Sequence, residues 1–200
     1  MIKRIKISMN KWLFIDRDGT INEFNTGYNY KKEHIKLIPG VQNLLAKFCA
    51  LGYKIVVITN QGGIGMGLYT VDDVNTVNEY INQLLAPYGA KIDAFYFCPH
   101  NEKDVVGEYK VKCSCRKPGN LLLERAIKDF SAQREQSLFL GDNITDKQCA
   151  EKSQIAFYPF EFRKVFTTSQ GFRIKIEEYS NDLIKDIISF AENLSKIKNG

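Results

Sequence analysis

The sequence predicts one α/β domain, built as a three-layer sandwich with a central, mainly parallel sheet between two layers of helices. Short apolar runs alternate along the chain with amphipathic stretches of helical period, the order expected when parallel strands are joined by helices. The run over 54–59, Lys-Ile-Val-Val-Ile-Thr, is a continuous β-branched run, as in strands covered on both faces. A length of 200 residues, 44% of them hydrophobic and 26% charged, suits one globular domain.

The first half of the chain divides into three strands and two helices, after a basic lead-in at residues 1–10. We expect strands over 12–15, 54–59 and 92–98, and helices over 41–51 and 71–85. Pro39-Gly40 opens the first helix and Gly52 ends it. Thr70 is the expected N-cap of the second helix, with Asp73 at the capping-box position.

The second half continues the alternation and ends in a less regular segment. We expect a helix over 119–130, a strand over 137–140, a short helix that ends near Ser153, and a strand over 155–158. Residues 160–176 are aromatic and basic, and favour a hairpin that turns at Ser169-Gln170-Gly171. A last helix, capped by Ser180, carries one apolar stripe made of Leu183, Ile184, Ile187, Ile188, Ala191 and Leu194.

We expect residues 1–158 to form the main domain and residues 159–200 to be an extension that packs on it. A dimer contact through the last helix is the alternative, so a monomer is expected and a dimer is the second possibility. The sequence shows no internal repeat and no low-complexity linker.

The charge and the apolar pattern exclude several classes of protein. The net charge of +5 lies mostly at the two ends of the chain; it fits an anionic substrate but lacks the long basic stripe of a nucleic-acid binder. No apolar run approaches the roughly 18 residues of a membrane helix, and the N-terminus lacks the apolar core of a signal peptide. We therefore expect a cytoplasmic protein, whose five cysteines are reduced.

Polar groups follow four of the predicted strands at the point where each strand ends. These groups are Asp16 with Asp18, Thr59 with Asn60, Arg116 with Lys117, and Asp142 with Asp146. Because the carboxyl ends of parallel strands meet at one edge of a sheet, where ligands bind, we expect these side chains to gather there. Carboxylates, a hydroxyl and a lysine suit phosphoryl transfer with a magnesium ion: acids hold the ion, cations bind phosphate, and one aspartate attacks phosphorus.

A second constellation lies in the loop that follows the third strand. Cys98, His100, Cys113 and Cys115 supply three thiols and an imidazole in two close pairs, which matches a closed, tetrahedral, structural zinc site. Bound zinc would pin the loop 98–115 and fix Arg116 and Lys117 directly after it. The alternative is two buried cysteines and an exposed histidine that lie close together in the sequence by coincidence. Cys49 and Cys149 are expected to be core residues.

The four polar groups, in this order and spacing, resemble the motifs of the haloacid dehalogenase (HAD) superfamily of phosphatases over residues 11–158. The motifs are Asp16-Arg17-Asp18-Gly19-Thr20, Thr59-Asn60-Gln61, Arg116-Lys117-Pro118 and Gly141-Asp142-x-x-Thr145-Asp146. The resemblance implies a Rossmann-like fold, and the sequence has no large insertion that could serve as a cap domain. A dehalogenase is disfavoured, because that chemistry needs neither magnesium nor a second acid such as Asp18.

The resemblance also implies a role for each residue. Asp16 would be the nucleophile that forms an aspartyl-phosphate, and Asp18 the general acid and then the general base. Magnesium would be held by Asp16, Asp142 and the backbone carbonyl of Asp18. Thr59 and Lys117 would hold the transferring phosphoryl group, with Asp146 as a supporting acid. We expect Asn60, Gln61 and Arg116 to contact the substrate, under a roof formed by the loops 22–36 and 62–67 and the zinc loop.

Within the superfamily, the zinc-loop pattern is similar to the heptose 1,7-bisphosphate phosphatases and the histidinol-phosphate phosphatases. The long gap between His100 and Cys113, and Gly27-Tyr28, favour the heptose branch, whose substrate is a small phosphorylated sugar used in surface-polysaccharide synthesis. Polynucleotide 3′-phosphatases share two motifs, but the zinc loop argues against them. Met66 and Asn143 depart from the pattern, since relatives often carry an arginine and a lysine there.

Two alternatives remain at the level of function. One is a phosphatase of histidinol phosphate or of another sugar phosphate. The other, from a different class, is a zinc-stabilised binding protein that kept the fold and lost the activity. The acid at Asp18 argues against the binding protein, because binding alone has no need of an acid-base group.

Overall fold

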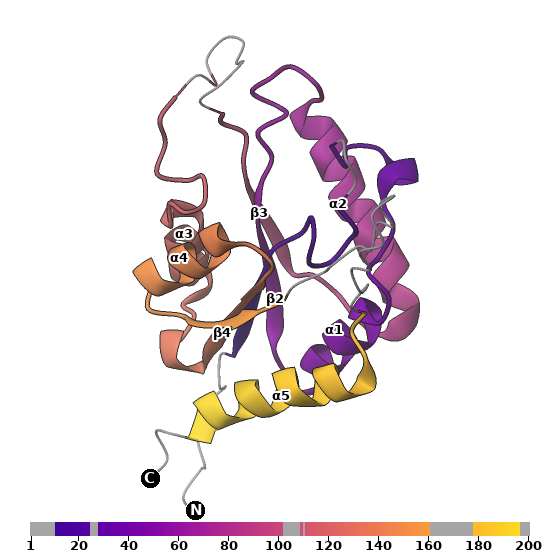
Figure 1. The fold of residues 1–200 in the computed structure, drawn as a ribbon, viewed down its shortest axis with the longest axis vertical. Helices are drawn as coiled ribbons and strands as arrows, with labels where there is room; N and C mark the ends of the chain where they lie inside the picture. The colour runs from indigo at the N-terminus through magenta and orange to yellow at the C-terminus, as the bar shows by residue number, and fades with distance from the viewer. Residues whose placement is uncertain (1–10, 25–27, 102–108, 110, 161–177, 197–200) are drawn as a thin grey trace, which may run out of the picture.

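The structure, a computed structural model, describes residues 11–24, 28–101, 109, 111–160 and 178–196. Its centre is a five-stranded sheet in the order β3-β2-β1-β4-β5, with all neighbouring strands parallel (Figure 1). The strands are β1 (Trp12–Ile15), β2 (Lys54–Asn60), β3 (Ala94–Cys98), β4 (Ser137–Gly141) and β5 (Ala156–Pro159). The predicted parallel α/β fold is confirmed.

Two layers of helices cover the sheet. The helices are α1 (Val41–Ala50), α2 (Val71–Leu85), α3 (Leu121–Phe130), α4 (Ile144–Lys152) and α5 (Asn181–Lys196), with short 3₁₀ turns at Lys32–His34, Ala86–Tyr88 and Arg134–Gln136. Leu13 and Ile15 of β1 share a core with α1, α2 and α5, while Trp12 and Phe14 share a core with α3 and α4. The sheet is therefore apolar on both faces, as its continuous apolar runs predict.

Local sequence signals set the helix starts. Thr70 and Asp73 form the predicted capping box of α2. Two elements begin two residues later than expected. β3 begins at Ala94, because Ile92 bonds through both its backbone N–H and its C=O to the side chain of Asn82 in α2. α3 begins at Leu121, after a turn closed by a hydrogen bond from the Gly119 N–H to the Arg116 carbonyl.

The last helix, α5, packs on the chain that precedes it. Ser180 caps it, since its Oγ accepts a hydrogen bond from the Leu183 amide at 3.2 Å. Ile184, Ile187 and Ala191 of the predicted stripe are buried in the core shared with α1 and α2. In Figure 1, α5 crosses the end of the molecule opposite to the loops that follow β2 and β3. The hairpin expected over 160–176 lies almost entirely outside the described residues.

No helix in the described parts of the chain is long and apolar enough to cross a membrane.

Candidate active site

The carboxyl edge of the sheet brings three acids and one lysine into contact. Lys117 Nζ forms ion pairs with Asp16 Oδ1 at 2.7 Å and with Asp146 Oδ1 at 2.6 Å, and donates a hydrogen bond to the Ile58 carbonyl at 2.8 Å. Carboxylate oxygens of Asp16, Asp142 and Asp146 all lie within 4.8 Å of one another. Asp16 directly follows β1, and its amide bonds to the Leu140 carbonyl of β4 at 3.0 Å.

The start of α4 presents the other two acids of this cluster. Asp142 follows β4, and Asp146 closes the capping box of α4 by accepting a hydrogen bond from the Asn143 amide at 3.0 Å. The side chain of Asn143 accepts the hydrogen bond of the Thr145 amide. Asn143, one of the two departures from the family pattern, is therefore the N-cap of the helix that carries Asp146.

The acid cluster carries more negative charge than its one lysine balances. Burial, together with the nearby carboxylates of Asp146 and Asp142, raises the pKa of Asp16 to about 7 although Lys117 opposes the shift. Burial and Asp146 likewise raise the pKa of Asp142 to about 6. Burial alone would lower the pKa of Lys117, but Asp16 and Asp146 outweigh it and raise that pKa. Such a set of close oxygen donors is what a divalent cation prefers.

Asp18 faces a different set of partners from Asp16. Its carboxylate accepts hydrogen bonds from Arg17, Asn22, Asn29 and Gln61 at 2.8–3.2 Å. Burial would raise the pKa of Asp18, but the Arg17 guanidinium and these hydrogen bonds outweigh burial and hold the pKa below its ordinary value. Two carboxylates one residue apart point to the same side only where the chain between them stays extended. The backbone instead turns, with the Arg17 carbonyl accepting the amides of residues 20–22.

A chain of hydrogen bonds fixes the side chain of Gln61. Tyr69 Oη donates to Gln61 Oε1 at 2.9 Å, so the amide nitrogen of Gln61 faces Asp18 at 2.8 Å and Thr59 Oγ1 at 3.0 Å. Gln61 and Tyr69 are both buried. Besides the predicted contact with substrate, Gln61 therefore has a structural role, because its side-chain amide orients Asp18.

Asn60 and Arg116 support the lysine and the rim of the site. The side-chain amide of Asn60 brackets the backbone of Lys117, accepting from its N–H at 2.9 Å and donating to its carbonyl at 3.1 Å. The guanidinium of Arg116 donates to the His100 carbonyl at 3.2 Å, which joins it to the predicted zinc loop. Asn60 thus holds Lys117 in place at the end of β2.

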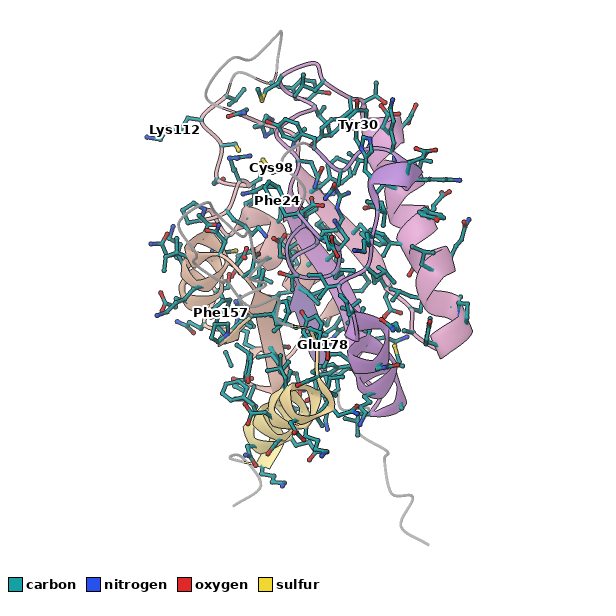
Figure 2. The ribbon with its side chains drawn as sticks, turned by 45° about the vertical axis from the view of Figure 1, so that its right-hand side comes forward. Phe24, Tyr30, Cys98, Lys112, Phe157 and Glu178 are labelled. Atoms are coloured by element: carbon teal, nitrogen blue, oxygen red, sulfur yellow. The ribbon has the colours of Figure 1, made fainter. Side chains whose placement is uncertain are left out.

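A cavity of about 370 Å³ opens over this edge. It is lined by all the predicted catalytic, substrate-binding and magnesium residues, namely Asp16, Asp18, Thr59, Asn60, Gln61, Arg116, Lys117, Asp142 and Asp146. Phe24, which is 63% exposed, and Tyr28 stand at its rim. Figure 2 shows Phe24 and Cys98 toward the same end of the molecule. The cavity is open and acidic at its base, with aromatic and amide groups on its walls.

The four predicted zinc ligands also come together. Sγ of Cys115 lies 3.1 Å from Cys98 Sγ, 3.0 Å from Cys113 Sγ and 3.1 Å from His100 Nδ1, and all four donor atoms lie within 4.8 Å of one another. None of these cysteines is in a disulfide. Three thiols and one imidazole at these separations fit a tetrahedral metal site with all four positions filled by protein.

Some groups at the site carry no signal in the sequence. Arg17 is fully buried, and its guanidinium bonds to Asn78 and to the Asn29 carbonyl besides Asp18. Asn22 and Asn29 belong to the loop 22–36, which was expected to form part of the roof over the substrate, but their side-chain amides donate to Asp18. From the sequence, Arg17 is recognisable only as a charged residue between two acids. Its burial depends on contacts with α2 and with the loop after β1, which the sequence does not reveal.

Comparison with known proteins identifies the family. A model of the family described as polynucleotide kinase 3 phosphatase matches residues 11–195. The D-glycero-beta-D-manno-heptose-1,7-bisphosphate 7-phosphatase of Haemophilus influenzae is 33% identical over 188 residues, which cover 94% of this chain and 100% of that protein. The D-glycero-alpha-D-manno-heptose-1,7-bisphosphate 7-phosphatase of Burkholderia mallei is 37% identical over 146 residues, 73% of this chain and 77% of that protein.

Solved structures of phosphatases also align with this chain. The D,D-heptose 1,7-bisphosphate phosphatase of B. bronchiseptica, complexed with magnesium and phosphate, aligns with a TM-score of 0.68 and 25% identity over 74% of this chain and 79% of that one. A HAD-like phosphatase from Mesorhizobium loti aligns with a TM-score of 0.78 and 26% identity, over 92% of this chain and 87% of that one.

The parallel sheet and its acidic carboxyl edge are those of HAD phosphatases, which hydrolyse phosphate monoesters. Within that class, the chain belongs to the polynucleotide kinase 3 phosphatase family, and the curated relatives quoted above are heptose bisphosphate phosphatases. The family match extends beyond residue 158, where the resemblance in the motifs ends, to residue 195.

Proposed function

We propose that this phosphatase removes the 7-phosphate of D-glycero-D-manno-heptose 1,7-bisphosphate, using magnesium and an aspartyl-phosphate intermediate. The observation that carries the chemistry is the buried arrangement in which Lys117 joins Asp16 and Asp146 beside Asp142, at the base of the cavity. The substrate is supported by the relative from Haemophilus influenzae, which matches over its whole length. The product would feed the synthesis of surface-polysaccharide precursors.

In the first half-reaction, Asp16 attacks phosphorus. A bond forms between its carboxylate oxygen and phosphorus, the ester bond breaks, and Asp18 gives its proton to the leaving oxygen. In the second half-reaction, Asp18 takes a proton from water as the water oxygen bonds to phosphorus and Asp16 is released. Lys117 and Thr59 hold the phosphoryl oxygens, and a bound magnesium ion would supply the remaining positive charge.

Asp18 must gain a proton before it can act as an acid. In the structure its five hydrogen bonds favour the ionised form. A phosphate dianion placed beside Asp18 raises its pKa, because like charges disfavour the ionised form. Substrate binding therefore supplies both the leaving group and the condition that protonates the acid.

We assign magnesium to Asp16, Asp142 and the carbonyl of Asp18, with Asp146 as the support that pairs with Lys117. Protons compete with the metal for Asp16 and Asp142, whose pKa values are about 7 and 6. We therefore expect the affinity for Mg²⁺ to rise about tenfold or more between pH 6 and pH 8. Calorimetric titration of the free enzyme with Mg²⁺ at the two pH values measures this, and equal affinities would contradict the assignment.

We assign structural zinc to Cys98, His100, Cys113 and Cys115. In Cys115→Ser the zinc content should fall well below one ion per chain. A cross-link over a loop of this size is worth about 2–4 kcal/mol, so Tm should fall by at least about 4–8 °C. The matched control is Cys49→Ser, which should keep its zinc because Cys49 lies in α1, away from the cluster. Full zinc content in Cys115→Ser would contradict the site.

The test of the substrate is phosphate release from three compounds side by side. They are heptose 1,7-bisphosphate, histidinol phosphate, and a 3′-phosphorylated oligonucleotide, the last because of the family to which the chain belongs. We expect the heptose to be preferred by about a hundredfold or more in kcat/KM, or roughly 2.7 kcal/mol of transition-state discrimination. Comparable, low rates on all three would refute the substrate and leave the chemistry in place.

Arg116 is proposed to reach the second phosphate of the substrate. Arg116→Gln should lower kcat/KM for heptose 1,7-bisphosphate by about tenfold to a hundredfold, because a charge-assisted hydrogen bond is lost. The same variant should change kcat/KM for heptose 7-phosphate, which lacks that group, by less than about threefold. Equal losses on both substrates would show that Arg116 acts elsewhere.

We further propose that the enzyme works as a cytoplasmic monomer, with residues 1–158 as the phosphatase domain and 159–200 as an extension of it. Reduced thiols suit zinc binding in that compartment, and the apolar stripe of α5 is already covered within the chain. Sedimentation of the purified protein should give a mass near 22.9 kDa, and a stable dimer would contradict the proposal.

A further inference from the structure

The described residues on either side of the stretch 161–177 meet beside the loop 16–20, which follows β1. The rings of Phe160, which follows β5, and Tyr179, which precedes α5, are stacked with centroids 3.9 Å apart and planes 9° apart. Both residues are buried. Figure 2 shows Glu178, the neighbour of Tyr179, beside α1 and above α5. The C-terminal extension thus returns to the sheet edge from which it leaves.

Two hydrogen bonds link this extension to the acid cluster. Tyr179 Oη donates to the Thr20 carbonyl at 2.9 Å, and Thr20 Oγ1 donates to Asp142 Oδ1 at 3.2 Å. Thr20 is fully buried. The neighbouring backbone also lies against the same acid, because a Cβ added at Gly19 would stand 2.5 Å from Asp142 Oδ2. A shift of this loop therefore moves or crowds Asp142.

Tyr179 is itself held firmly from behind. Its amide donates to the Pro39 carbonyl at 2.9 Å, and its own carbonyl lies so close to Gly40 that a Cβ there would approach to 2.3 Å. Its ring partner Phe160 donates its amide to the Gly141 carbonyl at 2.8 Å, next to Asp142 in the chain. The stacked pair therefore contacts two residues that adjoin Asp142. Tyr179 bonds to Thr20, whose side chain bonds to Asp142, and Phe160 bonds to Gly141, which precedes Asp142 in the chain.

We propose that Tyr179 is a positioning residue for the metal-binding acids, and that this is a role of the C-terminal extension. The hydroxyl of Tyr179 fixes the Thr20 peptide, and Thr20 fixes the carboxylate of Asp142. The inference rests on the proposed function for the identity of the ion that Asp142 holds. Under this proposal, a residue that is distant in the sequence helps to set the geometry of the acid cluster.

The test is Tyr179→Phe, which keeps the ring stack and removes the hydroxyl. Binding of Mn²⁺, a spectroscopic substitute for Mg²⁺, is followed by electron paramagnetic resonance without substrate. We expect Mn²⁺ to bind about threefold to tenfold more weakly, the equivalent of one lost hydrogen bond. The matched control is Tyr53→Phe: Tyr53 Oη donates to the Ala191 carbonyl at 3.1 Å, so it also ties α5 to the core, but next to the start of β2.

Tyr53→Phe should lower Tm about as much as Tyr179→Phe and leave Mn²⁺ binding unchanged. In a Thr20→Val background, which lacks the hydroxyl on Asp142, Tyr179→Phe should have less effect on Mn²⁺ binding than in the wild type, because both act on the same acid. Equal Mn²⁺ affinity in Tyr179→Phe and wild type, or equal effects in both backgrounds, would overturn the inference. If the wild type binds Mn²⁺ no better than Asp142→Asn, the proposed magnesium site itself is wrong, and the inference falls with it.

Discussion

Asp16→Asn is expected to lower kcat by about 10,000-fold or more, because the amide cannot act as the nucleophile. The fold should survive, since an asparagine oxygen can still face Lys117 Nζ, which lies 2.7 Å from Asp16 Oδ1. Phosphate release from the preferred substrate measures the loss. The control is Asp93→Asn, which removes a carboxylate paired with Lys54 beside the start of β2, and should keep kcat within about twofold.

Asp16→Asn should also change how the stability of the fold depends on pH. The pKa of Asp16 is raised to about 7 in the folded chain against 3.8 as its ordinary value. The folded state therefore binds this proton more tightly than the unfolded state, and metal-free wild type loses stability as pH rises between about 4 and 7. Asp16→Asn should lose less stability over this interval.

For the prediction about kcat, turnover by Asp16→Asn within about tenfold of wild type would contradict the role of Asp16 as the nucleophile.

Lys117→Met should be damaging in two ways. Loss of its charge removes a donor to the transferring phosphoryl group, which should lower kcat by about 100- to 1,000-fold. It also leaves buried carboxylates without a partner, since Lys117 pairs with both Asp16 and Asp146. Breaking a buried pair in this way costs about 3–5 kcal/mol. Urea unfolding at pH 8 measures the free energy of unfolding.

The pH dependence distinguishes this cost from ordinary damage to packing. At pH 5.5 Asp16 can bind a proton and lose its charge, so the destabilisation by Lys117→Met should be smaller than at pH 8. The control is Lys54→Met, because the Lys54–Asp93 pair is exposed at the lysine and its loss should cost less than about 1 kcal/mol. Equal, small losses in both variants at both pH values would contradict the account.

The fold could be predicted from the sequence because its signals are local. Apolar runs end in acids or glycine, and caps such as Thr70-Asp73 and Ser180 mark helix starts within a few residues. The parallel arrangement then follows from the alternation of strands and helices. Chain direction brings Asp16, Thr59 and Asp142, which follow or end parallel strands, to the edge where they line one cavity. Lys117 comes after the zinc loop and is held at the same edge by the side chain of Asn60.

What could not be predicted depends on contacts between residues that are distant in the chain. The orientation of Asp18 is set by Asn29 and Gln61, and by a turn at Arg17 that ends the extended backbone. Tyr179 and Thr20 are 159 positions apart. Neither periodicity nor spacing reports such pairs, because each member reads alone as an ordinary polar or aromatic residue.

The most direct test of the central claim is to trap the phosphorylated enzyme. Substrate labelled with ³²P at the 7-phosphate is mixed with enzyme and Mg²⁺, and the reaction is stopped in acid within one turnover. We expect protein-bound label that hydroxylamine releases, on the peptide that contains Asp16, and no label in Asp16→Asn. Turnover without any protein-bound label, or label on another residue, would contradict a covalent mechanism through Asp16.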